Sequence, residues 1–455
     1  MTQAKKMNVV QLTMLTAVNM LGSGIVLLPT KLAEVGAISI LSWLVTATGS
    51  LALAYAFARC GMLSRKTGGM GGYAEYTYGK AGNYLTNYTY GLSLLIANVA
   101  ISITAVGYIQ ELFGWKLSPL NVGLMTIFLL WLTTFANFGG ARITGRIGSI
   151  TVWGVIAPVV AVSTIGWFWF DSSIYAAGWN PHNNTWLQAA SASVAITLWA
   201  FLGLESACAN TDAVENPERN VPIAVLGGTI GAAVIYILST NVIAGIVENA
   251  ELVSSTAPFG LVFAKMFNPM VGSVIMGLMV LACIGSLLGW QFTIAQVFKS
   301  SADTGYFVPV FAKVNKAGTP IVGMLILLAV QTGLALLTIS PDLTKQFDIL
   351  VNLAVVTNII PYILCMGSLM TMQKVAGITP NKALLTNIVA WAAAAYSYLA
   401  LYSSGAQALM LGGVATIIGY TLFGFVNNRL INLEHERKLH EQPRAGVDTA
   451  PQPAP

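Results

Sequence analysis

Long apolar runs, separated by short polar stretches, account for nearly all of the chain between residues 8 and 430. A helix needs about 20 mostly apolar residues to cross the hydrocarbon core of a bilayer. The runs therefore predict an all-α integral membrane domain of about twelve transmembrane helices. The predicted spans are 8–34, 39–62, 84–112, 120–138, 148–170, 189–211, 221–247, 271–298, 320–340, 346–373, 384–403 and 407–427.

The composition agrees with a chain that is embedded in lipid. Hydrophobic residues make up 56% of the 455 positions and charged residues only 9%. A soluble domain carries roughly 25% charged residues, because its surface must be solvated. This chain has too few charges for such a surface, so the lipid bilayer is its predicted environment and no separate soluble domain is expected.

The positive charges fall mainly on one side of the predicted membrane. Because positively charged loops are retained in the cytoplasm, residues 1–7 are predicted to be a cytoplasmic N-terminus and 431–455 a disordered cytoplasmic tail. The basic residues are thereby explained as topology signals, which excludes nucleic-acid binding as their function. All of the 22 Lys and Arg residues lie on the side of the two termini except Lys31, Lys116, Lys265 and Lys345.

Two of the predicted spans are interrupted by glycine and polar residues. The first span contains Gly22, Ser23, Gly24 and Ile25 in succession, and the sixth contains Gly203 between Trp199 and Glu205. Backbone groups released from a helix in hydrocarbon need another partner, so such breaks are typical of helices that line a cavity. Interruptions at matching places in two five-helix halves indicate the central site of a transporter. The alternative is that these glycines only permit close helix packing.

Glu205 is the one acidic residue predicted to lie deep inside a span. A charge in the bilayer centre is expensive and usually faces a cavity or a partner. No Lys or Arg is predicted in the middle of any span, so a substrate amine is a candidate counter-charge. A protonated Glu205 that is hydrogen-bonded to nearby backbone is the alternative, and proton coupling is compatible with either interpretation.

Aromatic and polar residues near this acid are further candidates for the site. Trp199 and Trp290 could stack on an alkyl-ammonium chain, although tryptophans in membrane proteins also serve in interfacial belts and packing. Tyr90 and Asn98 lie two turns apart on roughly one face of the third span, and Asn98 is predicted to face the interior. The spans contain no evident nucleophile–base pair or metal-ligand cluster, so we expect no enzymatic activity and no cofactor.

Four stretches resemble the amino acid–polyamine–organocation (APC) superfamily. They are 22–25 with Pro29, 68–76, 199–206 and 215–222. Residues 22–36, 68–76, 205–228 and 287–301 are similar in particular to the bacterial putrescine–ornithine antiporters. The resemblance implies a leucine-transporter-type fold with an inverted 5+5 repeat (8–170 and 189–373), broken helices 1 and 6, and two further helices within 384–427. It also implies a location in the bacterial cytoplasmic membrane.

The same resemblance implies roles for individual residues. Glu205 matches the acid that binds the diamine, and Trp199 and Trp290 match aromatic positions of the gate or site. Tyr90, Cys60 and Glu75 match positions associated with transport, although Glu75 also fits a solvated acid at the entrance. Phe423 stands where the antiporter pattern has a tyrosine, so the hydroxyl found in relatives is lacking here.

The implied activity is exchange of cytoplasmic putrescine for external ornithine, with proton-coupled putrescine uptake as a second mode. The carboxylate of ornithine would find backbone N–H groups at the broken first span, around Ser23 and Gly24. Alternatives are the exchange of lysine for cadaverine or of arginine for agmatine, and a uniporting amino acid permease. The sequence leaves a homodimer open. The Gly-rich stretch 68–72 is predicted to be a connector before the third span.

Overall fold

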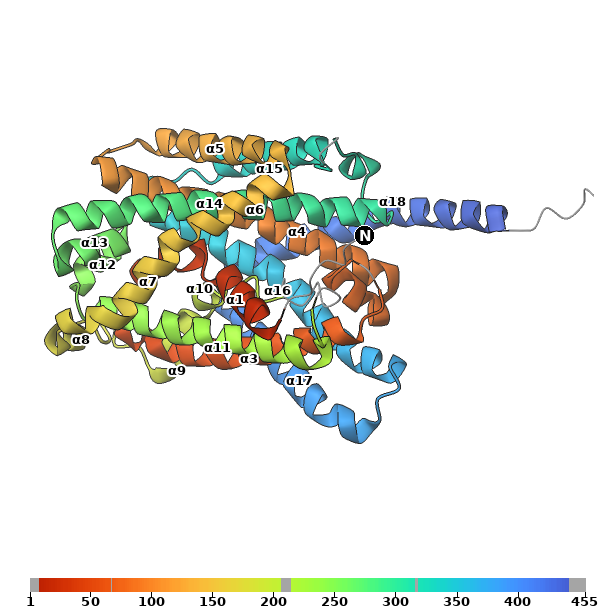
Figure 1. Ribbon diagram of the computed structural model, residues 1–455, viewed down its shortest axis with the longest axis horizontal. Helices are drawn as coiled ribbons and strands as arrows, with labels where there is room; N and C mark the ends of the chain where they lie inside the picture. Colours follow the sequence, from red (N-terminus) through yellow and green to blue (C-terminus); the bar gives the residue numbers. More distant parts are fainter. Residues whose placement is uncertain (1–7, 67, 206–213, 316–317, 442–455) are drawn as a thin grey trace, which may run out of the picture.

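Most of the chain folds into α-helices that lie side by side along the long axis of the molecule (Figure 1). The computed structural model describes residues 8–66, 68–205, 214–315 and 318–441, and these contain no β-strand. The α-helices are α1 (Val9–Met20), α2 (Leu28–Ala33), α3 (Ile40–Leu63), α4 (Met70–Phe113), α5 (Pro119–Ala136), α6 (Ala141–Thr151), α7 (Trp153–Ile165), α8 (Ser172–Ala177), α9 (Trp186–Ala192), α10 (Val194–Trp199), α11 (Pro217–Ala244), α12 (Asn249–Ser254), α13 (Pro258–Met266), α14 (Pro269–Asp303), α15 (Ile321–Leu337), α16 (Leu343–Val375), α17 (Pro380–Ser403) and α18 (Gly405–Glu441). Short 3₁₀ segments are η1 (Ser23–Ile25), η2 (Ala37–Ser39), η3 (Asn137–Gly139), η4 (Gly166–Trp169) and η7 (Pro309–Ala312).

Nine helical segments of the described chain are long and apolar enough to span a membrane. They are Ala37–Leu63, Met70–Phe113, Pro119–Gly139, Ile143–Trp169, Pro217–Ala244, Pro269–Asp303, Leu343–Val375, Pro380–Ser403 and Gly405–Asn432. The chain is thus an all-α, multi-pass membrane protein. The other three of the twelve predicted spans correspond to helices that are shorter, namely the first, the sixth and α15. Twelve crossings and the 5+5 repeat remain predictions.

The first span is divided into two helices. Asn8 and Gln11 form a capping box that begins α1, which ends at Met20. After η1, α2 begins at Leu28 with Pro29 in its first turn, a position at which the missing N–H of proline is no loss. In the sixth span, α10 ends at Trp199 and residues 200–205 form turns. Ser206 and Cys208 of this span lie outside the described residues.

Two boundaries differ from the sequence-based expectation. The stretch 68–72 was predicted to be a connector, but α4 already begins at Met70, and a kink at Gly79 (φ 61°, ψ −155°) separates its first turns from the membrane-embedded part. The helix α18 continues to Glu441, beyond residue 431, where a disordered tail was predicted. Residues 431–441 are rich in Leu, Glu, Arg and Lys, which are strong helix formers.

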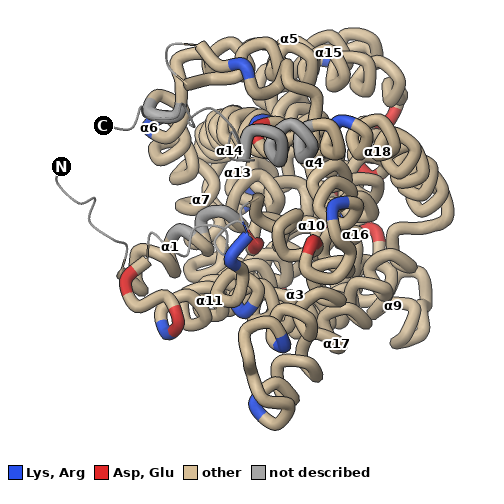
Figure 2. The backbone as a smooth tube through the Cα atoms, turned by 90° about the vertical axis from the view of Figure 1, so that its right-hand side faces the viewer, with Lys and Arg blue, Asp and Glu red and all other residues tan. Residues whose placement is uncertain are grey.

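Two ends of the bundle are useful landmarks. We call the end at which α18 terminates the basic end, and it also holds Lys66 and Lys299. Figure 2 views the molecule from this end, and Lys and Arg segments stand on the loops and helix ends that face the viewer. The opposite end holds α12 and α13 (Figure 1). The central helix α4 is the most completely buried span and packs along α16 and α14.

Candidate functional site

The breaks in the first and sixth spans meet at the centre of the bundle, where tyrosine hydroxyls satisfy the carbonyls that the breaks release. The hydroxyl of Tyr236, on α11, lies within hydrogen-bond distance of the carbonyl oxygens of Met20 (2.6 Å) and Ala200 (2.9 Å) and shares its one proton between them. The hydroxyl of Tyr108, on α4, donates to the carbonyl of Val26 (2.9 Å). Because an unpaired carbonyl in hydrocarbon costs several kcal/mol, these bonds explain how two breaks persist inside the membrane.

The glycines at the breaks have two roles, close helix packing and interruption of the helix beside a cavity. A Cβ on Gly24 would lie 3.2 Å from the Cα of Ala200, so the two broken segments touch backbone to backbone. Gly203 has a φ of +108°, a conformation that only glycine adopts readily. This turn points the N–H of Gly203 toward the side chain of Glu205. Gly24 therefore permits close packing of the two broken segments, and Gly203 orients the side chain of Glu205.

The carboxylate of Glu205 is held by three donors. The hydroxyl of Tyr362 donates to Oε2 (2.6 Å), the hydroxyl of Tyr90 donates to Oε1 (3.0 Å), and the N–H of Gly203 donates to Oε2 (3.0 Å). Glu205 is only 5% exposed, and none of the ion pairs among the described residues includes it. The carboxyl group thus has hydrogen-bond donors but no cationic partner among the described residues, an arrangement that suits a cationic ligand.

A cavity of about 740 Å³ extends from Glu205 toward the basic end. Gly22, Tyr90, Glu205 and Trp290 line it at the centre of the bundle. Gly68 and Gly69, which precede α4, and the last turns of α14 line it toward the basic end. Its volume is in the range of small-molecule sites. The first span, the sixth span and Trp290 thus meet around one space.

A smaller recess continues from the cavity on the far side of Glu205. Its volume of about 40 Å³ gives room for a few water-sized groups. The two spaces share Gly22, Glu205 and Trp290. Trp199 also lines the recess, so Trp199 and Glu205 face one space although they are about 120° apart on a regular helix. The remaining lining residues of the recess are Met20, Ser23, Gly24, Ser93, Leu94, Ala97, Ile101, Leu202, Gly203 and Asn358.

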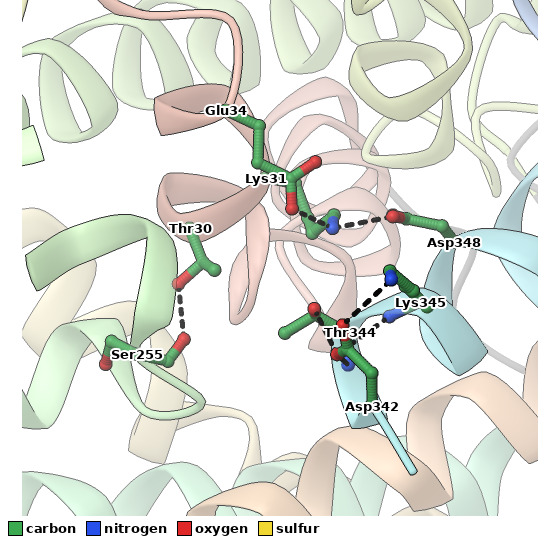
Figure 3. Close-up of polar contacts among 8 residues, drawn as sticks. All are labelled: Thr30, Lys31, Glu34, Ser255, Asp342, Thr344, Lys345 and Asp348. Carbon is green, nitrogen blue, oxygen red and sulfur yellow. Dashed lines mark hydrogen bonds and ion pairs between the residues drawn. The ribbon is translucent and has the colours of Figure 1, made fainter. Parts of the chain in front are cut away.

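Trp199, which lines the recess, contacts a segment of α16 that also forms an ion pair. The ring of Trp199 packs edge-on against Phe347, with centroids 6.4 Å apart. Beyond Phe347, the Lys31 ammonium lies between the carboxylates of Glu34 and Asp348, 2.6 Å from an oxygen of Asp348 (Figure 3). The Lys31 side chain is only 1% exposed. This ion pair joins α2 to α16.

Hydrogen bonds fix the same region from two sides. The hydroxyl of Thr30 donates to the carbonyl of Ser255 (2.7 Å; Figure 3), which follows α12. Asp342 caps α16 by accepting bonds from the N–H groups of Thr344 and Lys345. Burial alone would raise the pKa of Asp342, but these bonds and the Thr344 hydroxyl lower it. At the opposite end, α2 and α16 are therefore firmly held.

Several residues that the sequence singled out lie away from the lining of both spaces. Ile25 is fully buried, and Cys60, on α3, packs near the carbonyl of Cys365. The ring of Phe423, on α18, packs at a tilt of 37° against that of Tyr84, with ring centroids 5.4 Å apart. Asn98 is buried on α4, and its amide has no hydrogen-bond partner in the structure. Among the described residues, none of these four lines the cavity or the recess.

Glu75 lies near the start of α4 at the basic end and is engaged in a polar cluster. Its carboxylate forms an ion pair with Lys66 (2.7 Å) and accepts bonds from the Asn83 amide (2.7 Å) and the Tyr306 hydroxyl (3.4 Å). The Asn83 oxygen in turn accepts a bond from Asn87 (3.1 Å), which lines the cavity. Glu75 is thus linked to the cavity wall through two asparagines.

Sequence reasoning missed residues that only the fold brings to the site. Tyr362 and Asn358 lie on α16 and Tyr236 on α11, and each belongs to a run that reads as an ordinary apolar span. A polar or aromatic residue in such a run is usually a packing residue. The available signal was weak: Asn358 is an amide inside a long apolar segment, the same signal that pointed to Asn98.

Comparison with known proteins gives a consistent picture. A family model described as amino acid permease matches residues 7–425. The putrescine transporter PotE of Escherichia coli (strain K12) is 67% identical over 431 residues, which cover 94% of this chain and 98% of the relative. The putrescine transporter PotE of Haemophilus influenzae is 65% identical over 425 residues, covering 93% and 98% of the two chains. A cadaverine/lysine antiporter of Escherichia coli (strain K12) is 31% identical over 453 residues, 98% of each chain.

Proposed function

This chain belongs to the amino acid permease family, and we propose that it is a secondary antiporter that exchanges putrescine for ornithine. The relatives that are 65% and 67% identical along nearly their whole length are named putrescine transporters. The cadaverine/lysine antiporter named among the more distant relatives carries a diamine and a basic amino acid. Both names support a cationic substrate, and the name of the more distant relative also supports exchange between a basic amino acid and a diamine.

The observation that carries this proposal is the environment of Glu205. The carboxylate stands where the cavity meets the recess, and its donors are hydroxyl and N–H groups without positive charge. An ammonium group that reaches it would supply the missing counter-charge. Trp290 lines both spaces beside Glu205, and its ring face would attract the same cation.

In this proposal the broken first span receives the part of ornithine that putrescine lacks. Gly22, Ser23 and Gly24 line the recess. The hydroxyl of Ser23 is 3.0 Å from that of Ser286 on α14, so this segment already presents polar groups to the space. Backbone N–H groups near a helix break favour a carboxylate. One cavity can then hold a dication or an amino acid zwitterion with a cationic side chain.

The proposal includes a direction and a location. The chain would lie in the inner membrane of a bacterium with both termini in the cytoplasm, as the distribution of Lys and Arg predicts. The cavity would then open toward the cytoplasm, the side from which putrescine leaves. Proton-coupled uptake of putrescine is a second mode that the buried carboxylate would allow.

Counterflow in proteoliposomes tests the proposal. Vesicles loaded with ornithine should accumulate labelled putrescine, and vesicles without internal substrate should accumulate little. Equal uptake of putrescine with and without internal ornithine would contradict an exchange mechanism. Absence of putrescine uptake under both conditions would contradict putrescine as the substrate.

A panel of internal substrates separates the remaining substrate pairs. Lysine, arginine, cadaverine and agmatine should each drive less putrescine uptake than ornithine does. A preference for cadaverine and lysine would instead place this chain with its 31% identical relative. A steady uptake without any trans substrate would indicate a uniporting permease.

A further inference from the structure

Asn358 is a buried polar residue of the recess that has no partner. It lies on α16 and is 1% exposed, and neither atom of its amide makes a hydrogen bond among the described residues. The amide lies near the Tyr362 hydroxyl, one helical turn away, without the geometry of a hydrogen bond. A buried amide left unpaired is destabilising, and buried polar groups without a partner are rare. A polar ligand in the recess would supply the hydrogen-bond partner that the amide of Asn358 lacks.

The surroundings of Asn358 support a ligand rather than packing. Of the described residues that line the recess, Glu205 is the only charged one, and Leu94, Ala97 and Leu202 supply apolar wall. The hydroxyl of Ser93, also in the lining, is already bonded to the carbonyl of Ala354 (2.9 Å). The amide of Asn358 is therefore a free polar side chain in a mainly apolar recess, with a carboxylate at the junction with the cavity.

Asn358 and Glu205 line the same recess and are connected through Tyr362. Asn358 precedes Tyr362 by four residues on α16, or about 6 Å along the helix axis. The Tyr362 hydroxyl bonds directly to Glu205 (2.6 Å). Tyr362 thus connects the carboxylate of Glu205 to the turn of α16 that carries Asn358, and both side chains line the recess.

We propose that Asn358 determines substrate specificity by binding the second polar end of a substrate whose first ammonium is bound by Glu205. This inference rests on the proposed function of the site. An asparagine amide carries an acceptor and two donors. Its oxygen accepts from the second ammonium of a diamine, and its nitrogen donates to the carboxylate of an amino acid. One side chain thus serves both partners of the exchange.

The test compares a diamine with a monoamine of the same chain length in the full-length protein. Equilibrium binding of labelled putrescine, and its displacement by 1-aminobutane, are measured for the wild type and for Asn358→Leu. The substitution should weaken putrescine binding about ten- to hundredfold, the effect of losing a hydrogen bond to a charged group. It should leave 1-aminobutane nearly unchanged, because a monoamine has no group for Asn358. An equal loss for both amines, or no loss for putrescine, would overturn the inference.

A neighbouring residue provides the matched control. Thr357 is also buried on α16, but its hydroxyl bonds to the carbonyl of Leu353 in its own helix (2.9 Å) and it does not line the recess. Thr357→Val removes a buried polar atom at nearly constant size. It should keep the preference for putrescine over 1-aminobutane. If it abolished that preference as Asn358→Leu does, the effect would be structural and the inference would fail.

A second variant covers the case in which Asn358→Leu does not fold. Asn358→Asp keeps the size and places a carboxylate in the recess, so the ratio of putrescine affinity to ornithine affinity should rise severalfold. An unchanged or lower ratio would contradict the inference. The wild-type measurement separates the two levels of argument: absence of putrescine binding in the wild type refutes the proposed function, whereas unaltered specificity in both variants refutes only the role of Asn358.

Discussion

Glu205 and Lys31 are both charged side chains buried in the bundle, but they are satisfied in different ways. Lys31 lies between two carboxylates, and its charge is neutralised by the protein itself (Figure 3). Glu205 receives two hydroxyls and a backbone N–H and lies beside a cavity. The neutralised charge joins α2 to α16. In the proposed function, the acid without an internal counter-ion binds the ammonium group of the substrate. If the proposed function is correct, the way in which a buried charge is paired separates a structural role from a binding role.

The strongest test of this comparison is Glu205→Gln. The amide keeps the size of the side chain but cannot neutralise an ammonium, so the dissociation constant for putrescine should rise more than about a hundredfold, corresponding to roughly 3–5 kcal/mol. Equilibrium binding to the purified protein measures it. Glu251→Gln is the matched control, because Glu251 is an exposed acid paired with Lys265 away from both spaces. Near-normal putrescine affinity in Glu205→Gln would refute a binding role for this acid.

Lys31→Met tests the other half of the comparison. It leaves two carboxylates without their shared cation. We expect a loss of about 2–3 kcal/mol of unfolding free energy, less than for fully buried pairs because Glu34 and Asp348 are partly exposed. Thermal unfolding in detergent is the measurement. The double variant Lys31→Met/Asp348→Asn should recover part of the loss.

An exposed lysine at the same end serves as the control. Lys345 is 76% exposed, and its ammonium lies as far as 3.9 Å from the nearest carboxylate oxygen of Asp342. Because this ion pair is long and exposed, Lys345→Met should change the unfolding free energy by no more than about 0.5 kcal/mol. Equal stability of Lys31→Met and the wild type would show that the buried lysine does not hold α2 to α16.

A smaller effect is expected from the hydroxyls that hold Glu205. Tyr362→Phe removes the donor at 2.6 Å and Tyr90→Phe the donor at 3.0 Å. Each bond stabilises and orients the charged carboxylate. Tyr362→Phe should weaken putrescine binding by about 1–2 kcal/mol, roughly five- to thirtyfold, and Tyr90→Phe by less. Binding that is unaffected by both substitutions would mean that the carboxylate needs no internal donors to hold its ligand.

The smallest effect is expected from Trp290→Leu. This change removes a ring face rather than a charge, so putrescine affinity should fall by about 1 kcal/mol, roughly fivefold. Trp391→Leu is the control, because Trp391 is 67% exposed on α17, where it would face lipid. A loss in Trp290→Leu as large as that in Glu205→Gln would shift the main recognition from the acid to the ring.

Much of the site could be predicted because its chemistry is unusual for a membrane span. A carboxylate among apolar residues and a Gly-Ser-Gly sequence inside a span are visible in one dimension, and Gly22, Ser23, Gly24, Trp199, Glu205 and Trp290 do line one central region. Asn98 was singled out for the same reason, as a polar residue inside an apolar span, but it lines neither the cavity nor the recess. A polar residue in an apolar span indicates a side chain that faces away from lipid, but it does not indicate which interior surface that side chain contacts.

The helical, multi-pass architecture, the broken first span and the central acid could be predicted from the sequence. These follow from local properties, namely the length of apolar runs, the conformational freedom of glycine and the cost of a charge in lipid. The residues that complete the candidate site could be recognised only once the helices were seen packed together. Tyr362, Asn358 and Tyr236 look ordinary along the chain, and Lys31 looks like a charge near the end of the first predicted span. Their roles depend on groups far away in sequence. Tyr362 bonds to Glu205, Tyr236 to the carbonyl of Met20 and Lys31 to Asp348, and Asn358 lines the recess. These groups come together only when the helices pack.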